Sequence, residues 1–160
     1  MMKVILGAVC VLVAASQLSA AISPANIAGR WQGDSWANEG ASKLTLDIVR
    51  CGEGWCGVKV EANNSCGGTA LRLDAGTSEE EFVQFKGSLQ LAAKTEPYVV
   101  QVSIFGPDSN EPAGSAPKLQ ITGDTGGQFR AYRRSFPFEA QLVRVQDAVC
   151  RMPQTVSVLR

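Results

Sequence analysis

Residues 43–60 read KLTLDIVRCGEGWCGVKV, and this stretch decides the fold. The apolar positions that alternate with polar ones in its first half are Leu44, Leu46 and Ile48. Alternation with a period of two is typical of a β-strand with one buried face, because successive side chains point to opposite faces. The stretch therefore predicts two antiparallel strands, at residues 43–51 and 55–62, joined by a turn at the Gly-containing residues 52–54.

The same alternation recurs along the rest of the chain. It predicts further strands at residues 29–33, 70–73, 82–91, 98–105, 119–122, 129–133 and 140–145. No segment of more than ten residues has apolar positions at helical spacing without a Gly, Pro or β-rich interruption. Residues 106–117 are rich in Pro, Ser, Gly and Asn and are expected to form an exposed loop. We therefore predict an all-β domain over residues 21–160, either a small antiparallel β-barrel or a sandwich of about eight strands.

The first 20 residues have the layout of a secretory signal peptide. A short positive start that includes Lys3 precedes an apolar run at residues 4–15 and a small polar run at 16–20. The apolar run of about a dozen residues is shorter than the roughly 20 that a membrane-spanning helix needs. We expect cleavage near Ala20 or Ala21, which would leave no membrane span and would place the mature protein in the periplasm or outside the cell.

Cleavage would also remove one of the chain's five cysteines, Cys10. The remaining four allow three pairings, and disulfides persist in the oxidising compartments that an exported chain reaches. We favour Cys51 with Cys56, because these residues face each other across the predicted hairpin. Cys66 would then pair with Cys150 and close a loop of about 85 residues. A zinc site would be the alternative use of these cysteines, but their spacing fits it poorly and the chain has no histidine.

The charge balance argues against general nucleic-acid binding. The chain has 15 Lys and Arg residues and 15 Asp and Glu residues, and loss of Lys3 brings the mature net charge to about −1. The absence of histidine removes the commonest acid–base residue and the commonest metal ligand. The segment 108–111 has oxygen ligand types that suit calcium, but two prolines flank it and a plain loop is expected there. The sequence thus predicts no metal and no cofactor.

One segment, Gly123-Asp124-Thr125-Gly126-Gly127, invites an enzyme assignment. It resembles the nucleophile loop of chymotrypsin-like proteases with Thr in place of Ser, and its centre resembles the Asp-Thr-Gly signature of retroviral-type aspartic proteases. A Thr nucleophile would need a general base, and the chain has no histidine to supply one. The aspartic-protease family has an apolar strand running directly into its Asp, whereas Gly123 precedes Asp124 here. We expect a hairpin turn with positive φ, and no enzyme.

Residues 129–138 read FRAYRRSFPF, the densest cationic and aromatic cluster in the chain. If the segment begins as a strand, Arg130, Tyr132 and Arg134 share one face. One hypothesis is an anion-binding or partner-binding face, in which the guanidinium groups hold a carboxylate or phosphate. The other interpretation is that these arginines are solvated or paired with nearby acids while the aromatic residues fill the core.

Two motifs resemble known families. Gly29-Arg30-Trp31 looks like the G-x-W of lipocalins and related calycin barrels, in which the Trp closes one end of the barrel under an Arg from a late strand. This resemblance implies that Trp31 closes the barrel here and that Arg144 covers it, with the cation over the ring face. Together with the C-G-x-x-x-C-G hairpin at residues 51–57, the motif is similar to the small secreted bacterial family called domain of unknown function 2147, which implies an envelope location.

A second resemblance points to another function. Residues 23–31, SPANIAGRW, are similar to the entry of bacterial inhibitors of secreted metalloproteases, which insert an N-terminal arm into the protease cleft. The sequence therefore leaves two hypotheses open. The first is an exported, non-enzymatic barrel that binds a small ligand or an envelope partner, and the alternative is a metalloprotease inhibitor. Neither the identity of the ligand nor the oligomeric state follows from the residues.

Overall fold

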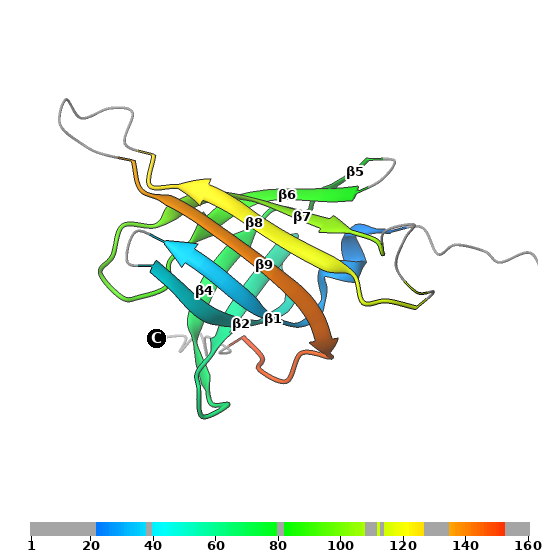
Figure 1. Ribbon diagram of the computed structural model, residues 1–160, viewed down its shortest axis with the longest axis horizontal. Coiled ribbons are helices and arrows are strands. Elements are labelled where there is room, and N and C mark those ends of the chain that lie inside the picture. Colours follow the sequence, from blue (N-terminus) through cyan, green and yellow to red (C-terminus); the bar gives the residue numbers. More distant parts are fainter. Residues whose placement is uncertain are drawn as a thin grey trace, which may run out of the picture.

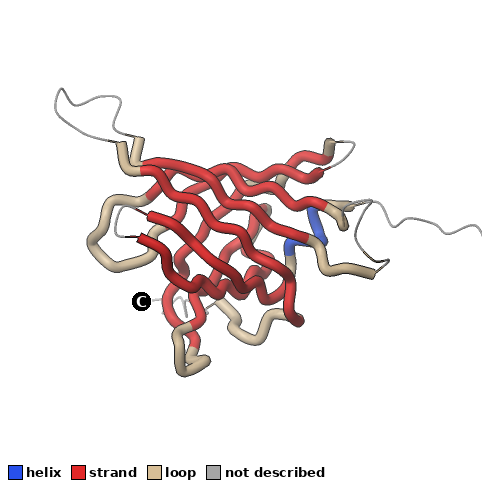
Figure 2. Tube along the Cα trace, viewed as in Figure 1, coloured by secondary structure: helices blue, strands red, loops and turns tan. Residues whose placement is uncertain are grey.

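The computed structural model describes residues 22–37, 40–79, 82–107, 112, 114–126 and 135–152 (Figure 1). The expected signal peptide at residues 1–20 lies outside them. Strands make up most of the described chain, with one short helix (Figure 2). The elements are a 3₁₀ helix at Pro24–Ile27 and the strands β1 (Gly29–Ala37), β2 (Gly40–Cys51), β3 (Gly54–Val60), β4 (Cys66–Leu73), β5 (Thr77–Ser78), β6 (Phe82–Leu89), β7 (Tyr98–Phe105), β8 (Lys118–Asp124) and β9 (Pro137–Gln146).

The strands form a closed antiparallel barrel. Their order is β4-β3-β2-β1-β9-β8-β7-β6-β5, and an additional pairing of β4 with β6 closes the sheet into eight strands, with β5 as a short extra strand on β6. The closing seam joins only three residue pairs, including Leu73 with Gly87. A Cβ at Gly87 would lie 1.9 Å from the carbonyl oxygen of Arg72, so only glycine allows this approach. The predicted all-β fold is confirmed, as a barrel rather than a sandwich.

The barrel is filled with side chains. All eight of its strands contribute inward-facing apolar residues to one cluster, as expected for an eight-stranded barrel, which is just wide enough to be filled. The alternation at residues 44, 46 and 48 predicted this correctly, because Leu44, Leu46 and Ile48 are all buried. The cluster extends from Ile27 and Trp31 at one end, the closed end, to Phe138 near the other, the open end.

Both predicted disulfides are present. Cys51 is bonded to Cys56 and Cys66 to Cys150, with Cα–Cα distances of 5.7 and 5.6 Å. Cys51 lies opposite Gly54 in the register and Cys56 opposite Val49, so the hairpin bridge is diagonal rather than between directly opposed residues. A diagonal pair in an antiparallel ladder is still close enough for a disulfide.

The region around Gly123 differs from the prediction. Gly123 and Asp124 continue β8, pairing with Val100 and Val99 of β7, because the absence of a side chain lets Gly123 lie against the Val99 carbonyl oxygen. Gly126, with φ 65°, does adopt the positive φ expected of a turn. Both edges of β8 are taken by β7 and β9, so the connection between β8 and β9 spans residues 125–136. The strand predicted at residues 129–133 lies outside the described residues.

Candidate binding surface

The closed end of the barrel is blocked by a tryptophan and the 3₁₀ helix. The Trp31 side chain is fully buried, and its Nε1 donates a hydrogen bond to the Ile27 carbonyl oxygen at 2.7 Å. Asn26 caps the helix, because its Oδ1 accepts hydrogen bonds from the backbone N–H and the hydroxyl of Ser23. Ile22 packs against the core cluster. Among the described residues, these side chains therefore block this end of the barrel interior.

Arg144 contacts the closed end in a different way from the one expected. It lies opposite Trp31 in the register of β1 and β9, but its Nε donates to the Ala28 carbonyl oxygen at 3.1 Å and its Nη2 to Asp147 at 2.7 Å. Gly29, with φ 143°, makes room for this path, since a Cβ there would lie 2.5 Å from Arg144 Nε. The guanidinium thus fixes the backbone that enters β1.

The arginine that the structure does place over a ring belongs to another pair. Arg50 lies over Trp55, with 4.9 Å between its guanidinium carbon and the ring centroid. Trp55 is 6% exposed, and its Nε1 is buried without a hydrogen-bond partner among the described residues. The cation–π contact at the β2–β3 hairpin thus joins Arg50 and Trp55, whereas the predicted pair was Arg144 and Trp31.

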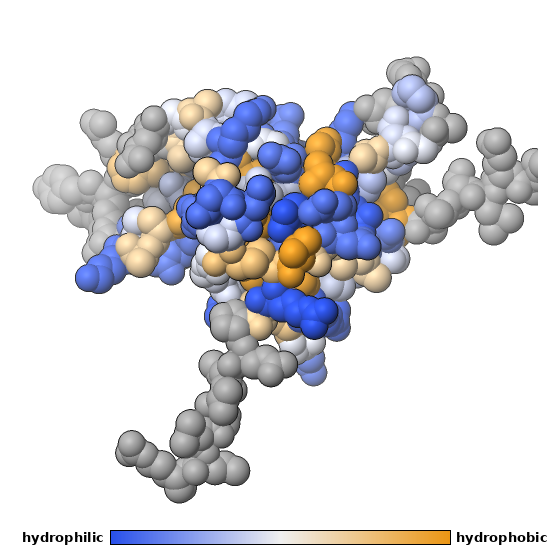
Figure 3. Space-filling model, turned by 90° about the horizontal axis from the view of Figure 1, so that it is seen from below, coloured by the Kyte–Doolittle hydropathy of each residue, from blue (hydrophilic) through white to orange (hydrophobic). Residues whose placement is uncertain are grey.

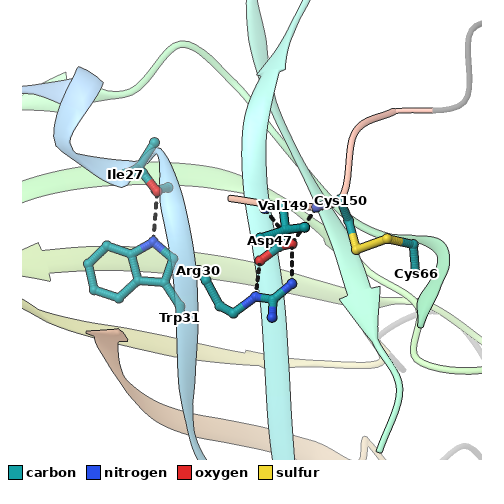
Figure 4. Close-up of polar contacts among 7 residues, drawn as sticks. All are labelled: Ile27, Arg30, Trp31, Asp47, Cys66, Val149 and Cys150. Atoms are coloured by element: carbon teal, nitrogen blue, oxygen red, sulfur yellow. Dashed lines mark hydrogen bonds and ion pairs between the residues drawn. A yellow bond between two sulfur atoms is a disulfide. The ribbon is translucent and has the colours of Figure 1, made fainter. Parts of the chain in front are cut away.

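A buried ion pair lies on the outer side of β1 and β2. Arg30 donates from Nε and Nη2 to the two carboxylate oxygens of Asp47, at 2.7 and 2.8 Å (Figure 4). Asp47 Oδ2 also accepts the backbone N–H groups of Val149 and Cys150, at 2.9 and 2.6 Å. Asp47 is fully buried and Arg30 is 9% exposed. Four hydrogen bonds therefore satisfy one buried carboxylate.

These contacts set the protonation state of the pair. Burial by itself raises the pKa of Asp47, but the hydrogen bonds from Arg30, Cys150 and Val149 outweigh it, so this pKa lies below its ordinary value. The hydrogen bond to Asp47 raises the pKa of Arg30 above its ordinary value. Both groups are therefore charged at neutral pH. They face each other and the C-terminal segment, so their hydrogen bonds hold that segment against the barrel.

Residues 147–152, here called the C-terminal strap, cross the outside of the barrel below β1 (Figure 1). Asp47 binds the strap backbone, and the Cys66–Cys150 bridge ties it to β4. Thr69 Oγ1 of β4 donates to the sulfur of Met152 at 3.4 Å. A second hydrophobic cluster beneath the strap consists of Val58, Val60, Cys150 and Met152. The strap thus covers the outer face of β2 to β4.

The alternation of residues in β1 and β2 does not reveal this buried ion pair. Asp47 stands at a polar position of an alternating strand, and such positions ordinarily face water. Arg30 is the variable residue of the G-x-W motif. The available signal was the Cys66–Cys150 pairing, which requires the chain after β9 to return across the barrel wall.

The open end carries a hollow of about 550 Å³, which is within the range of small-ligand sites. Its lining residues come from the ends of β1, β2, β7 and β8 and from the chain between β6 and β7. These strand ends are on the left of Figure 1. Its lining includes Ser42, Leu91, Thr95, Tyr98, Thr125 and Phe136. The strand predicted to reach Leu91 ends at Leu89, and Leu91 packs against the core from above. The hollow is therefore a basin on top of the filled barrel.

The proposed anion-binding residues Arg130, Tyr132 and Arg134 lie outside the described residues. The residues that flank this segment are described and lie at the open end. Thr125 and Phe136 both line the hollow, and the Thr125 N–H donates to the Phe136 carbonyl oxygen at 3.3 Å. The Phe136 N–H in turn donates to the Thr125 hydroxyl at 3.1 Å. The segment therefore leaves and rejoins the barrel at the rim of the hollow.

Other features of the described part of the chain are few. It contains no group of three or more His, Cys, Asp or Glu side chains that could hold a metal ion. Within those same ranges, no helix is long and apolar enough to cross a membrane. One outer face carries small apolar areas divided by hydrophilic side chains (Figure 3).

Comparison with known proteins adds no family. No family model, curated protein or solved structure matches the chain. The likeness to domain of unknown function 2147 and to the metalloprotease inhibitors therefore rests on the motifs alone. The function is therefore inferred from the geometry of the molecule.

Proposed function

We propose that this protein is an exported, non-enzymatic barrel that binds a partner at its open end. The observation that carries the proposal is the position of the hollow, which lies above a filled core and between three connections. Because inward-facing side chains fill the barrel, a ligand that needs an enclosed interior would have no room. The hollow can instead accept a chain segment or a side chain of an envelope partner, which would enter from the open end. Such an occupant fits it better than a small molecule that must be enclosed.

Chemistry at the rim supports the same proposal. Phe136 is 38% exposed, and the rings of Tyr98 and Phe138 make a tilted contact just inside the rim, with 5.1 Å between their centroids. Aromatic residues that are rigidly held and partly exposed are frequent energetic centres of protein interfaces. The absence of histidine and the structural role of Arg30 and Asp47 favour binding over catalysis. Two disulfides favour an oxidising compartment.

A photo-crosslinking side chain tests the site in the producing cells. Placed at position 136, it should yield a discrete protein adduct, because that side chain lies on the rim. The matched control is position 53, an exposed residue in the β2–β3 turn at the opposite end. Equal labelling from both positions, or none from position 136, would refute the proposal. An alkaline phosphatase fusion to residues 1–25 tests export separately.

The arginine segment can be tested in the same assay. Reversing the charge at Arg130 and Arg134 should reduce the adduct formed from position 136 if these residues hold an anionic group of the partner. Reversing Arg151, an exposed arginine on the strap, is the matched control. Adduct yield unchanged by the first pair would remove the anion-binding hypothesis and leave the hollow itself as the site.

The metalloprotease inhibitor remains the second proposal, and the position of the N-terminus separates its site from the hollow. The contacts of Ile22 with the core and the capping of the helix by Asn26 fix the chain at the closed end, away from the hollow. An N-terminal arm would therefore act from the end opposite the rim. Fusing a small folded domain before Ala21 should abolish inhibition of a co-secreted metalloprotease without changing the adduct at position 136. Inhibition that survives the fusion would exclude the arm mechanism.

A further inference from the structure

A row of hydrogen-bonding side chains crosses the outer wall of the barrel, away from the open-end hollow. In the strand register, Asp34 of β1 lies opposite Gln141 of β9, and Gln141 lies opposite Gln120 of β8. Neighbouring strands are about 4.8 Å apart, so the three side chains form a ladder at that spacing. All three line a groove of about 390 Å³. The groove therefore has a regular series of polar groups along its floor.

Aromatic side chains lie at the two ends of this row. Trp36 of β1 and Phe105 of β7 both line the groove. Trp36 is 43% exposed, and none of the described residues forms a hydrogen bond with its indole N–H. A second hollow of about 200 Å³ lies on the far side of Trp36, beside Pro137 and Glu139. The Phe105 ring is held by a contact of 5.9 Å with Phe82. The Phe105 ring is thus supported by a neighbouring ring, whereas Trp36 has open space on both sides.

The charge of the groove excludes several occupants. Asp34 is neutralised by Lys43 of the neighbouring strand, at 2.7 Å. The amides of Gln120 and Gln141 are neutral, and Gln141 donates weakly to Glu139 at 3.3 Å. A polyanion would need excess positive charge, and a lipid would need a continuous apolar surface. Lys118 and the exposed Val143 also line the groove, but single side chains of these kinds give neither clustered positive charge nor a continuous apolar surface.

Backbone pairing excludes an extended peptide added as a strand. Such a peptide needs a free strand edge, and β1, β7, β8 and β9 are each paired on both sides. Recognition on this wall must use side chains only. A sugar ring matches what they offer, because its C–H face packs on an aromatic ring while its hydroxyls bond to amides and carboxylates.

We propose that this outer groove binds a neutral oligosaccharide, with Trp36 as the stacking platform and Gln141, Gln120 and Asp34 as hydroxyl partners. This site goes beyond the proposed partner site at the open end and does not depend on it. Strand spacing close to the repeat of an extended glycan lets successive sugar units meet successive side chains of the row.

Trp36 supplies a direct readout. The chain has three tryptophans, and Trp31 and Trp55 are buried, so an added sugar should change the fluorescence of Trp36 alone. The probes are tetrasaccharides of β-1,4-linked N-acetylglucosamine, β-1,4-linked glucose and α-1,4-linked glucose, titrated into the mature chain and checked by calorimetry. At least one is expected to bind saturably below about 10 mM.

Single substitutions test whether the sugar binds in the outer groove. Trp36→Ala should weaken it by about tenfold or more, and Gln141→Ala or Gln120→Ala by about three- to tenfold. The matched controls are Gln101→Ala, an exposed amide on β7 outside the groove, and Phe136→Ala at the open end, and both should bind as the parent does. Circular dichroism checks that each variant folds. Binding of none of the three sugars, or binding unaffected by Trp36→Ala, would overturn the proposal. Loss of the position 136 adduct without loss of sugar binding would reject only the open-end site.

Discussion

The closed end and the open end of this barrel are stabilised by different means. At the closed end, Trp31 hydrogen-bonds to the 3₁₀ helix, Arg144 holds the backbone before β1, and Cys51–Cys56 ties the adjoining hairpin. At the open end, the described connections are held by hydrogen bonds and by packing of side chains such as Leu91. Both disulfides and the buried hydrogen bonds of Trp31 and Asp47 thus lie at the closed end and the strap, away from the proposed binding site.

Removal of the Cys66–Cys150 disulfide should have the largest effect on the stability of the barrel. Cys66→Ser with Cys150→Ser should cost about 4–5 kcal/mol of unfolding free energy, because it frees a long loop in the unfolded chain. The matched control, Cys51→Ser with Cys56→Ser, opens a short loop and should cost about 2 kcal/mol. Urea unfolding of both pairs measures the difference. Equal losses would show that the strap adds nothing beyond the hairpin bridge.

The buried ion pair should give the next largest effect. Asp47→Ala leaves the Arg30 charge unpaired and two strap N–H groups without an acceptor, so it should cost about 3–5 kcal/mol. Asp34→Ala removes the exposed carboxylate that pairs with Lys43 and should cost about 0–1 kcal/mol. Equilibrium unfolding compares the two variants. A loss below about 1 kcal/mol for Asp47→Ala would contradict the role assigned to the pair.

Acid should weaken the attachment of the strap to the barrel, because it protonates the Asp47 carboxylate. Since the pKa of Asp47 is lowered in the folded state, its contribution is present at neutral pH and is lost as the pH falls below about 4 towards the folded-state value. The stability gap between the parent chain and Asp47→Asn should therefore shrink between about pH 7 and pH 3. Unfolding free energies measured across this range test the sign. A constant or widening gap would mean that Asp47 is not held ionised by its partners.

The smallest stability effect is expected at the open end. Phe136→Ala removes a side chain that is 38% exposed and should change the unfolding free energy by no more than about 1 kcal/mol. Phe85→Ala, a fully buried core position, should cost about 3–5 kcal/mol in comparison. Thermal and urea unfolding distinguish these outcomes. A large loss at Phe136 would make the rim part of the stable core rather than a separate binding region.

Much of this fold could be predicted from the sequence, and the failures have physical reasons. Period-two alternation predicted β1 to β4 and β6 to β9, because each has one buried face, but not the two-residue β5. The hairpin geometry predicted the disulfide pairing. The β4–β6 seam could not be found, since Gly87 carries no side chain pattern that marks closure. Asp124 was assigned to a turn because Gly-rich runs usually turn, whereas here close strand contact requires Gly123.

The candidate sites were harder to predict than the fold. Trp31 was expected at the closed end and lies buried there, but Arg144 turns to a carbonyl oxygen that no sequence pattern marks. Asp47 looked like an ordinary solvent-facing residue, because alternation cannot show that a distant segment covers the outer face. The open-end hollow and the outer groove arise from residues that are far apart in the chain. Arg130, Tyr132 and Arg134 stay a prediction.

The strap also sets an order for maturation. A chain that emerges from its N-terminus presents Cys51 and Cys56 first, and a short loop closes more readily than a long one. In a chain that is exported and cleaved as proposed, Cys66 is the remaining thiol once these two have paired, until Cys150 arrives. Emergence in this order would leave one native partner for the last bond.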